Sequence, residues 1–170
     1  MYRTGDQIAA RVAEVRRDVE GLAAQARAYG VTAGFHNHSG AYVGEAVWDG
    51  RAILEGLDEK WIGYYFDACH ATAEGGEAGW NIALRMALPR VKMVALKDFY
   101  WVKTGGQWVM QMCPMGEGMV KWAEVFGLLA GARFAGPISV HIEYEPTDVL
   151  GAVARDLEFA KKQIAAAYGR

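Results

Sequence analysis

The sequence has few cysteines and no long apolar run. Its 170 residues include only Cys69 and Cys113, too few and too far apart for a disulfide framework or a thiolate zinc site. Its apolar runs are well short of the roughly 20 residues that a bilayer-spanning helix needs. Residues 1–8 carry charges where a signal peptide has an apolar core. We therefore expect a cytoplasmic protein without a membrane partner.

The sequence also lacks an excess of basic charge. It contains 18 Lys and Arg against 20 Asp and Glu, with a net charge of -2, which argues against a nucleic-acid partner. Apolar residues make up 52% of the chain and charged residues 22%, a balance that favours a folded core over disorder. Because no linker-like or low-complexity stretch interrupts the chain, we expect residues 1–170 to form one domain.

Short apolar runs alternate with segments of helical periodicity. The runs 31–35, 61–66, 91–96 and 137–142 predict buried strands. The periodicity predicts helices over 8–29, 48–57, 77–88 and 119–131, and a last helix with Leu150, Leu157 and Ile164 on one face. Trp48, Trp80, Trp122 and Phe126 are expected to pack into the core, and 99–118 reads as a loop. This alternation favours βαβ units and a parallel sheet.

Chemically active side chains gather where the predicted strands end. They are His36, His38, Asp67, His70, Lys97, Asp98, His141, Glu143 and Glu145. The carboxyl ends of parallel strands meet at one edge of a sheet, so we expect these groups to share a site, although a single histidine there is more often structural. Imidazoles and carboxylates without thiolates suit manganese, zinc, cobalt or magnesium. Beside a substrate carbonyl, such an ion supports proton transfer, which is isomerase or epimerase chemistry.

Five short motifs resemble those of the sugar phosphate isomerase/epimerase family, which has the xylose-isomerase-like TIM barrel. They are residues 34–38 (GFHNH), 66–70 (FDACH), 96–99 (LKDF), 114–118 (PMGEG) and 142–145 (IEYE). The resemblance extends from about Val19 to Glu145 and implies a partial (β/α)8 barrel with strands five to eight. A full barrel needs at least about 200 residues, so the first four strands are missing.

The resemblance also implies roles for individual residues. The family holds its metal with a glutamate, an aspartate, a histidine and a glutamate at the ends of strands five to eight. Asp67 and Glu143 match that pattern, His36 stands in place of the first glutamate, and Ala95 in place of the histidine. We therefore expect His36, Asp67 and Glu143 to bind the metal. Glu143 would also act in catalysis, with His70, Lys97 and His38 as candidates for substrate contact and the missing proton-transfer group.

Several alternatives remain open. The same metal would also serve the dehydration of a keto-polyol, and Ala95 is consistent with a barrel that has lost catalysis. The half barrel is explained by a missing N-terminal half, which we favour, by a homodimer, or by a gene remnant. We expect the isolated chain to bind a divalent ion weakly and to turn over little sugar or keto-sugar. The aromatic residues after residue 98 fit a lid over a sugar ring or loop packing, and phosphate binding at residues 116–118 is the weaker interpretation.

Overall fold

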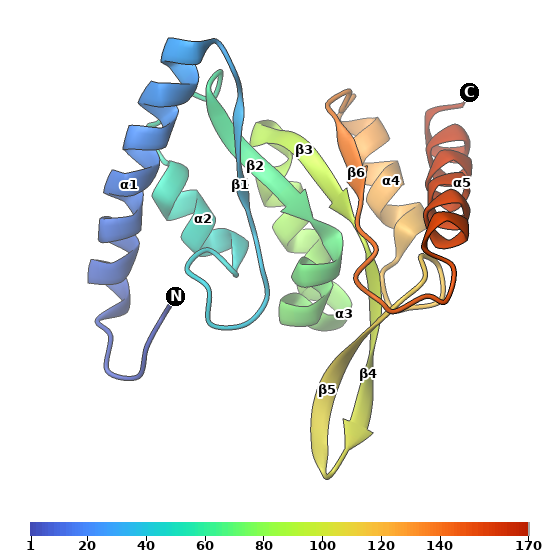
Figure 1. Cartoon of the computed structure of the whole chain (residues 1–170). Helices are drawn as coiled ribbons and strands as arrows, with labels where there is room; N and C mark the ends of the chain where they lie inside the picture. Colours follow the sequence, from blue (N-terminus) through green and yellow to red (C-terminus); the bar gives the residue numbers. More distant parts are fainter. Residues whose placement is uncertain (170) are drawn as a thin grey trace.

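Parallel strands alternate with helices along the chain (Figure 1). The computed structural model describes residues 1–169. Its elements are α1 (Ile8–Tyr29), β1 (Ala33–His36), α2 (Val47–Leu54), β2 (Ile62–Asp67), α3 (Ala68–Ala87), the 3-10 turn η1 (Leu88–Arg90), β3 (Val91–Leu96), β4 (Asp98–Thr104), β5 (Gln107–Cys113), α4 (Trp122–Gly131), β6 (Ile138–Val140) and α5 (Val149–Tyr168). The four parallel strands lie in the order β1-β2-β3-β6, which confirms the predicted α/β half barrel.

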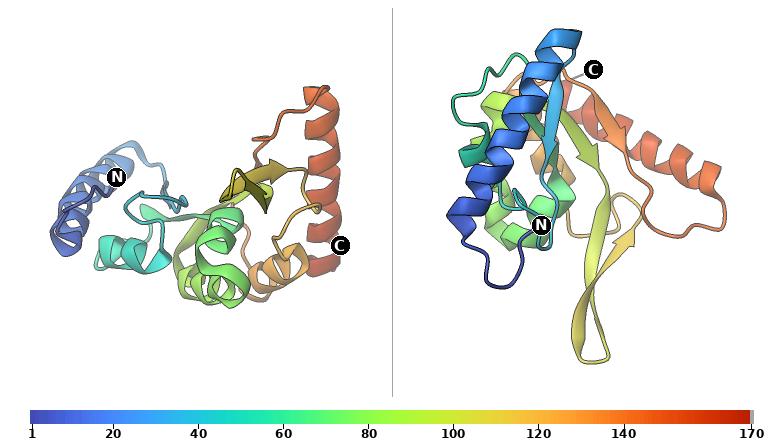
Figure 2. Two further views of the ribbon diagram at one scale, coloured as in Figure 1. Left: turned by 90° about the horizontal axis from the view of Figure 1, so that it is seen from below. Right: turned by 60° about the vertical axis from the view of Figure 1, so that its left-hand side comes forward.

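The core lies between the sheet and its helices. Tyr64 and Phe66 of β2 alternate with residues of the opposite face and join the same buried cluster as Trp80 of α3 and Phe126 of α4. Trp122 is also buried, whereas Trp48 is 51% exposed, so its predicted core position is wrong. Viewed toward one end of the sheet, the helices α1 to α5 follow one another in an arc (Figure 2, left).

The opposite face of the sheet carries polar side chains, and neighbouring strands leave little space between them. A side chain at Gly34 of β1 would press on Tyr65 of β2 and on Met93 of β3, so this crossing needs glycine. Tyr65 also contacts Ser139 of β6 and His141, the residue directly after β6. In the sheet, β6 lies next to β3. The register places Asp67 beside Ala95, and Ala95 beside Ser139. The inner face of this half barrel therefore carries the groups that gather at the strand ends.

Two predicted segments differ from the structure. Residues 99–118, expected as a loop, contain an antiparallel hairpin of β4 and β5 that projects beyond the sheet (Figure 1). A helical segment that was not predicted begins at Ala68, directly after β2, where the Asp67 side chain caps it. Gly76 has non-helical backbone angles (φ 57°, ψ -148°) and kinks α3, so the second part of this helix begins at Glu77, as predicted.

The margins of the half barrel are open. Within residues 1–169, β1 and β6 each pair with a strand on one side only. The helices beside these edges expose apolar side chains: Leu22 of α1 is 52% exposed, and Leu150 of α5 is 82% exposed. The apolar face predicted for the last helix is thus only partly covered. No helix in the described part combines the length and hydrophobicity needed to cross a membrane.

Candidate active site

Asp67 lies at the centre of the site because it ends β2 and starts α3. Its carboxylate is fully buried. One oxygen, Oδ1, accepts the backbone N–H of His70 at 2.9 Å and thereby caps α3. Asn37, also fully buried, accepts the backbone N–H of Asp67 and donates to its carbonyl, which ties the end of β1 to that of β2. The other oxygen, Oδ2, is left for the site.

Two histidines approach this free oxygen. His36 Nε2 lies 3.2 Å from Asp67 Oδ2, and His70 Nε2 lies 3.8 Å from it. Burial alone would raise the pKa of Asp67, but the His36 hydrogen bond and the nearby His70 and Lys97 outweigh it, so that the pKa lies below its usual value. The carboxylate is therefore ionised at neutral pH.

His70 has the geometry of a metal ligand. It is only 3% exposed, and burial lowers its pKa to about 4, so the ring is neutral. Its Nδ1 is 2.8 Å from Ser39 Oγ, whereas the buried Nε2 has no hydrogen-bond partner among the described residues. When Nδ1 donates to Ser39, Nε2 keeps a free lone pair and lies 3.8 Å from Asp67 Oδ2. Metal-bound histidines commonly donate their second N–H in this way.

The three residues together fit a divalent metal ion. His36, Asp67 and His70 offer ligand atoms that all lie within 4.8 Å of one another. Two imidazoles and one carboxylate form a donor set that zinc, cobalt, iron and manganese accept. The unpartnered Nε2 of His70 supports this fit, since a buried polar atom without a partner is costly. His70, expected beside the substrate, thus joins the candidate ligands.

Glu143 lies next to this group but contacts Lys97. Its Oε1 is 2.7 Å from Lys97 Nζ and 3.6 Å from His141 Nδ1. Burial raises its pKa, but the hydrogen bond from Lys97 more than offsets this, so that the pKa lies below its usual value. Lys97 is 2% exposed, and its Nζ also lies 3.5 Å from Asp67 Oδ2. The ammonium group thus lies between the two carboxylates.

His38, the remaining predicted site residue, lies at the margin. Its ring centroid is 3.9 Å from that of His70, and its Nδ1 is 2.9 Å from the Ser39 carbonyl oxygen. It packs against His70 and the ring of Tyr42. The strand ends therefore bring the candidate ligands and proton-transfer groups into one neighbourhood, whereas Asp98, also expected there, binds groups of the hairpin base and of α4.

Tyr65 and Ser139, which were not predicted, also lie at this site together with His141, which was expected there. Tyr65 OH is 2.8 Å from His141 Nε2, Ser139 Oγ is 3.0 Å from the same nitrogen, and the two hydroxyls contact each other. The Tyr65 ring stacks on His36 at 4.7 Å. The two-residue alternation that places Asp67 on the inner face also places Tyr65 there, and this is the signal that would have identified it.

A pocket of about 490 Å³ opens beside Glu143. It lies between the β4–β5 hairpin and the segment after β6, and its lining includes Tyr100, Gln111, Glu117, Glu143 and Glu145. The volume is within the roughly 300–1,000 Å³ typical of ligand sites. Three carboxylates thus line the pocket, and that of Glu143 is paired with Lys97.

The predicted phosphate turn at residues 116–118 has another role. Asp98 is fully buried and accepts the backbone N–H groups of Phe99, Gly116 and Val120 and the indole N–H of Trp122. This carboxylate fastens the base of the hairpin to the turn and to α4. The Gly116 amide is thus already bound.

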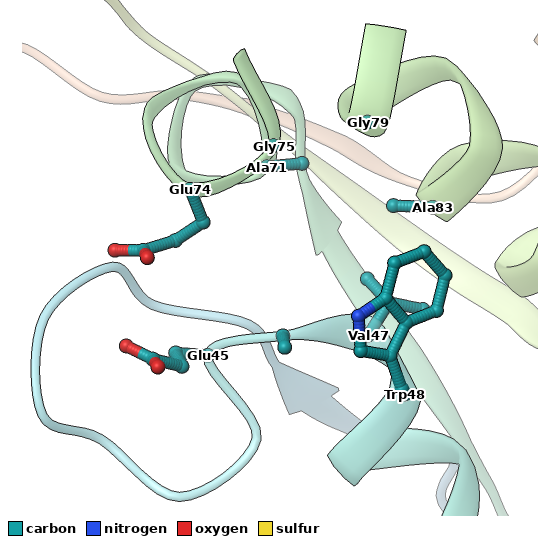
Figure 3. A pocket seen from close by; sticks show the side chains of 9 residues that line it. Glu45, Val47, Trp48, Ala71, Glu74, Gly75, Gly79 and Ala83 are labelled. Atoms are coloured by element: carbon teal, nitrogen blue, oxygen red, sulfur yellow. The ribbon is translucent and has the colours of Figure 1, made fainter.

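A second, smaller cavity lies between the start of α2 and α3 (Figure 3). Its volume is about 80 Å³, below the range typical of ligand sites. Figure 3 shows Glu45 and Glu74 at one side and the Trp48 indole at the other. Glu74 Oε1 accepts the Gly40 amide N–H, so this carboxylate holds the loop after β1. We assign the cavity no ligand.

Comparison with known proteins identifies the fold. Three solved structures match 93–94% of the chain: a xylose isomerase domain protein from Planctomyces limnophilus (19% identity, TM-score 0.73), a xylose isomerase-like TIM barrel protein from Mycobacterium smegmatis in complex with magnesium (18%, 0.71), and 3-keto-D-glucoside 4-epimerase from E. coli (15%, 0.72).

These matches cover 54%, 52% and 56% of the solved chains, so this chain spans about half of their length. Other matching structures include sugar 3-epimerases and a probable 3-DHS dehydratase. No curated protein sequence matches. The family model described as "Xylose isomerase-like TIM barrel" matches residues 2–163. The chain therefore belongs to the xylose isomerase-like TIM barrel family.

Proposed function

We propose that this chain carries the metal-binding half of an isomerase or epimerase that moves a proton next to the carbonyl of a sugar or keto-sugar. The observation that carries the proposal is the convergence of His36, Asp67 and His70 within 4.8 Å, with Glu143 and Lys97 beside them. A bound divalent ion would supply a Lewis acid that stabilises negative charge on substrate oxygens. Solved sugar epimerases of the same fold support the assignment.

In this proposal the residues of the site have distinct roles. His36, Asp67 and His70 hold the ion. Glu143 faces the 490 Å³ pocket and accepts the proton, because its lowered pKa keeps it ionised at neutral pH. His38 is the candidate second proton-transfer group, since His70 is buried and Lys97 is held by two carboxylates. Tyr100 of the hairpin lines the same pocket.

The substrate of this site is an unphosphorylated sugar. Glu117, Glu143 and Glu145 all line the pocket; Lys97 compensates the charge of Glu143, and the other two carboxylates add to the unfavourable field that a phosphate would meet. Hydroxyl groups instead find acceptors in these carboxylates and partners in Gln111 and Tyr100. One structure of this fold was solved as a D-allulose 3-epimerase in complex with D-allulose, and this sugar is the first probe that we would test.

The remaining wall of the pocket comes from four further β/α units in this proposal. The unpaired outer sides of β1 and β6 and the exposed apolar residues of α1 and α5 are the surfaces that those units would cover. They belong to the rest of a longer polypeptide or to a second copy of the chain. Size-exclusion chromatography with light scattering separates a dimer from a monomer.

The experiment combines metal binding with solvent exchange. The purified chain, loaded with Mn²⁺ or Co²⁺, is incubated with D-allulose in D₂O, and NMR follows deuterium at the carbons next to the carbonyl. We expect exchange that is lost in Asp67→Asn and kept in Glu158→Gln, an exposed carboxylate of α5 outside the pocket lining. Absence of metal binding, or equal exchange in Asp67→Asn, would contradict the proposal. Release of water instead of exchange would indicate the dehydratase.

A further inference from the structure

Within residues 1–169, Lys97 is the one lysine or arginine that forms an ion pair with the ligand group, and it is almost completely buried. Its Nζ lies 2.7 Å from Glu143 Oε1 and 3.5 Å from Asp67 Oδ2, and the side chain is 2% exposed. A buried ammonium group is costly unless it is paired. Here two carboxylates share it, and the longer contact is with the carboxylate that also faces the histidines. The position of Lys97 is therefore fixed by ionic contacts on two sides.

Because of its contact with Lys97, the Glu143 carboxylate differs in role from the Asp67 carboxylate. Asp67 Oδ2 faces His36 and His70, and together they form the group whose ligand atoms lie within 4.8 Å of one another. Glu143 is outside that group, and its Oε1 is engaged by Lys97. To reach a metal ion at the histidines, Glu143 would have to break its contact with the Lys97 ammonium group. Otherwise the ammonium group would have to move with Glu143 toward the positively charged metal ion. Both changes cost electrostatic energy.

Ala95 leaves the ligand group without a histidine from β3. It is fully buried and pairs with Asp67 in the strand register, two residues before Lys97, which directly follows β3. Continuing the alternation of side chains along the strand, Met93, Ala95 and Lys97 share the inner face. With alanine at position 95, the side chain that this part of the chain offers to Asp67, among the described contacts, is that of Lys97. The end of β3 thus contributes a cation to the site and no ligand.

From these contacts we infer that Lys97 is a positioning residue that keeps Glu143 out of the coordination shell of the metal. The ion is held by His36, Asp67 and His70, and Glu143 stays a free carboxylate turned toward the substrate pocket. The inference rests on the metal site of the proposed function and adds to it the division between ligand and base. It also predicts a three-residue shell with positions open to substrate oxygens.

The test is a titration of the purified chain with Co²⁺, followed by calorimetry and by the visible spectrum of the ion, with no substrate present. If Glu143 is outside the shell, Glu143→Gln leaves the spectrum unchanged and raises the Kd by less than about tenfold, because only the counter-charge of Lys97 is lost. Loss of a first ligand, as in Asp67→Asn, weakens binding by at least about 100-fold, more than the loss of an outer-shell partner. Glu145→Gln, also an exposed carboxylate in the pocket lining, is the matched control.

Lys97→Met provides the second arm. Removing the ammonium group releases Glu143 and takes a like charge away from the ion, so the Kd falls by about tenfold or more. The double variant Lys97→Met/Glu143→Gln loses the part of this gain that Glu143 supplies as a new ligand, and its spectrum returns to that of the parent. Circular dichroism checks folding; if Lys97→Met does not fold, the Glu143→Gln arm decides alone.

The outcomes separate this inference from the proposed function. If the parent chain binds Co²⁺ and Asp67→Asn does not, the metal site stands, and Glu143→Gln then tests Lys97 independently. A loss of tenfold or more in Glu143→Gln, with a changed spectrum, would show that Glu143 is a ligand and would overturn the inference. If the parent chain binds no Co²⁺, both proposals fail.

Discussion

Acid should destabilise this protein through His70. Burial lowers the pKa of this imidazole from its ordinary 6.5 to about 4, because the charged ring would lose its hydration beside Lys97 and two other histidines. The unfolded chain therefore binds a proton at a pH where the folded protein does not. Stability contributed by neutral His70 is complete above the unfolded pKa and is lost as the pH falls from about 6.5 toward 4.

The magnitude follows from these two values. One pKa unit corresponds to about 1.4 kcal/mol, so the full difference of two and a half units amounts to about 3 kcal/mol below pH 4. At pH 5 the linkage relation gives about 2 kcal/mol, and at pH 7.5 it gives nearly none. The free energy of unfolding should thus fall by about 2 kcal/mol between pH 7.5 and 5 on account of this group alone.

Urea unfolding at the two pH values, followed by tryptophan fluorescence in the presence of a chelator, measures this loss. The matched variant is His70→Gln, which keeps a polar side chain at the position but cannot titrate. The other three histidines are present in both proteins, so their contributions cancel in the difference between the two pH dependences. Equal pH dependences for the parent and the variant would refute the assignment of a buried, neutral His70.

Three further predictions concern the scaffold. Asp98→Ala leaves four N–H donors without their acceptor and should lower the free energy of unfolding by roughly 3–5 kcal/mol, measured by urea denaturation; a loss below 1 kcal/mol would contradict the role given to Asp98. Gly116→Ala should lower the free energy of unfolding by about 1–3 kcal/mol, because the residue has a φ of 86° and a methyl group would overlap the Phe159 ring. The control Gly21→Ala lies in open space on α1 and should stabilise the protein slightly. Equal effects of the two substitutions would be inconsistent with this reasoning. Burial raises the pKa of both thiols, that of Cys113 to about 12, so neither should react with a disulfide reagent until the chain unfolds, and rapid labelling of the folded protein would show that the thiols are accessible.

The sequence predicted the parallel strands because their apolar runs are short and end in polar groups. It missed the hairpin of β4 and β5, although Gly105 and Gly106 stand between two runs of alternating residues, which is a strong hairpin signal. Both glycines have positive φ, as a tight turn of this kind requires. The many aromatic residues on both sides favoured the interpretation as a loop lid.

The candidate site was predictable in part. That the strand ends bring His36, Asp67 and His70 together follows from the topology of a parallel sheet, but which side chains touch does not. His70 was expected at the substrate side, and only its burial and its unpartnered Nε2 place it among the ligands. The contact of Lys97 with Glu143 joins residues 46 positions apart through a long flexible side chain, and no local pattern encodes it.

The division between ligands and base changes the charge that a substrate meets. The ligand set implied by the family resemblance, with two glutamates and an aspartate, outweighs a divalent ion by one negative charge. In the arrangement inferred here, Asp67 is the only anionic ligand, and Lys97 and Glu143 neutralise each other. A site with a divalent ion then carries a net positive charge, and in a partly buried pocket this difference favours negative charge on the substrate oxygen more strongly than it would in water. At the same time, a carboxylate paired with a single ammonium group gives up less of its charge than one bound to a divalent ion, and is the better proton acceptor of the two. The loss of the first glutamate and of the histidine at position 95 is thus compatible with proton transfer, provided that Lys97 keeps Glu143 free.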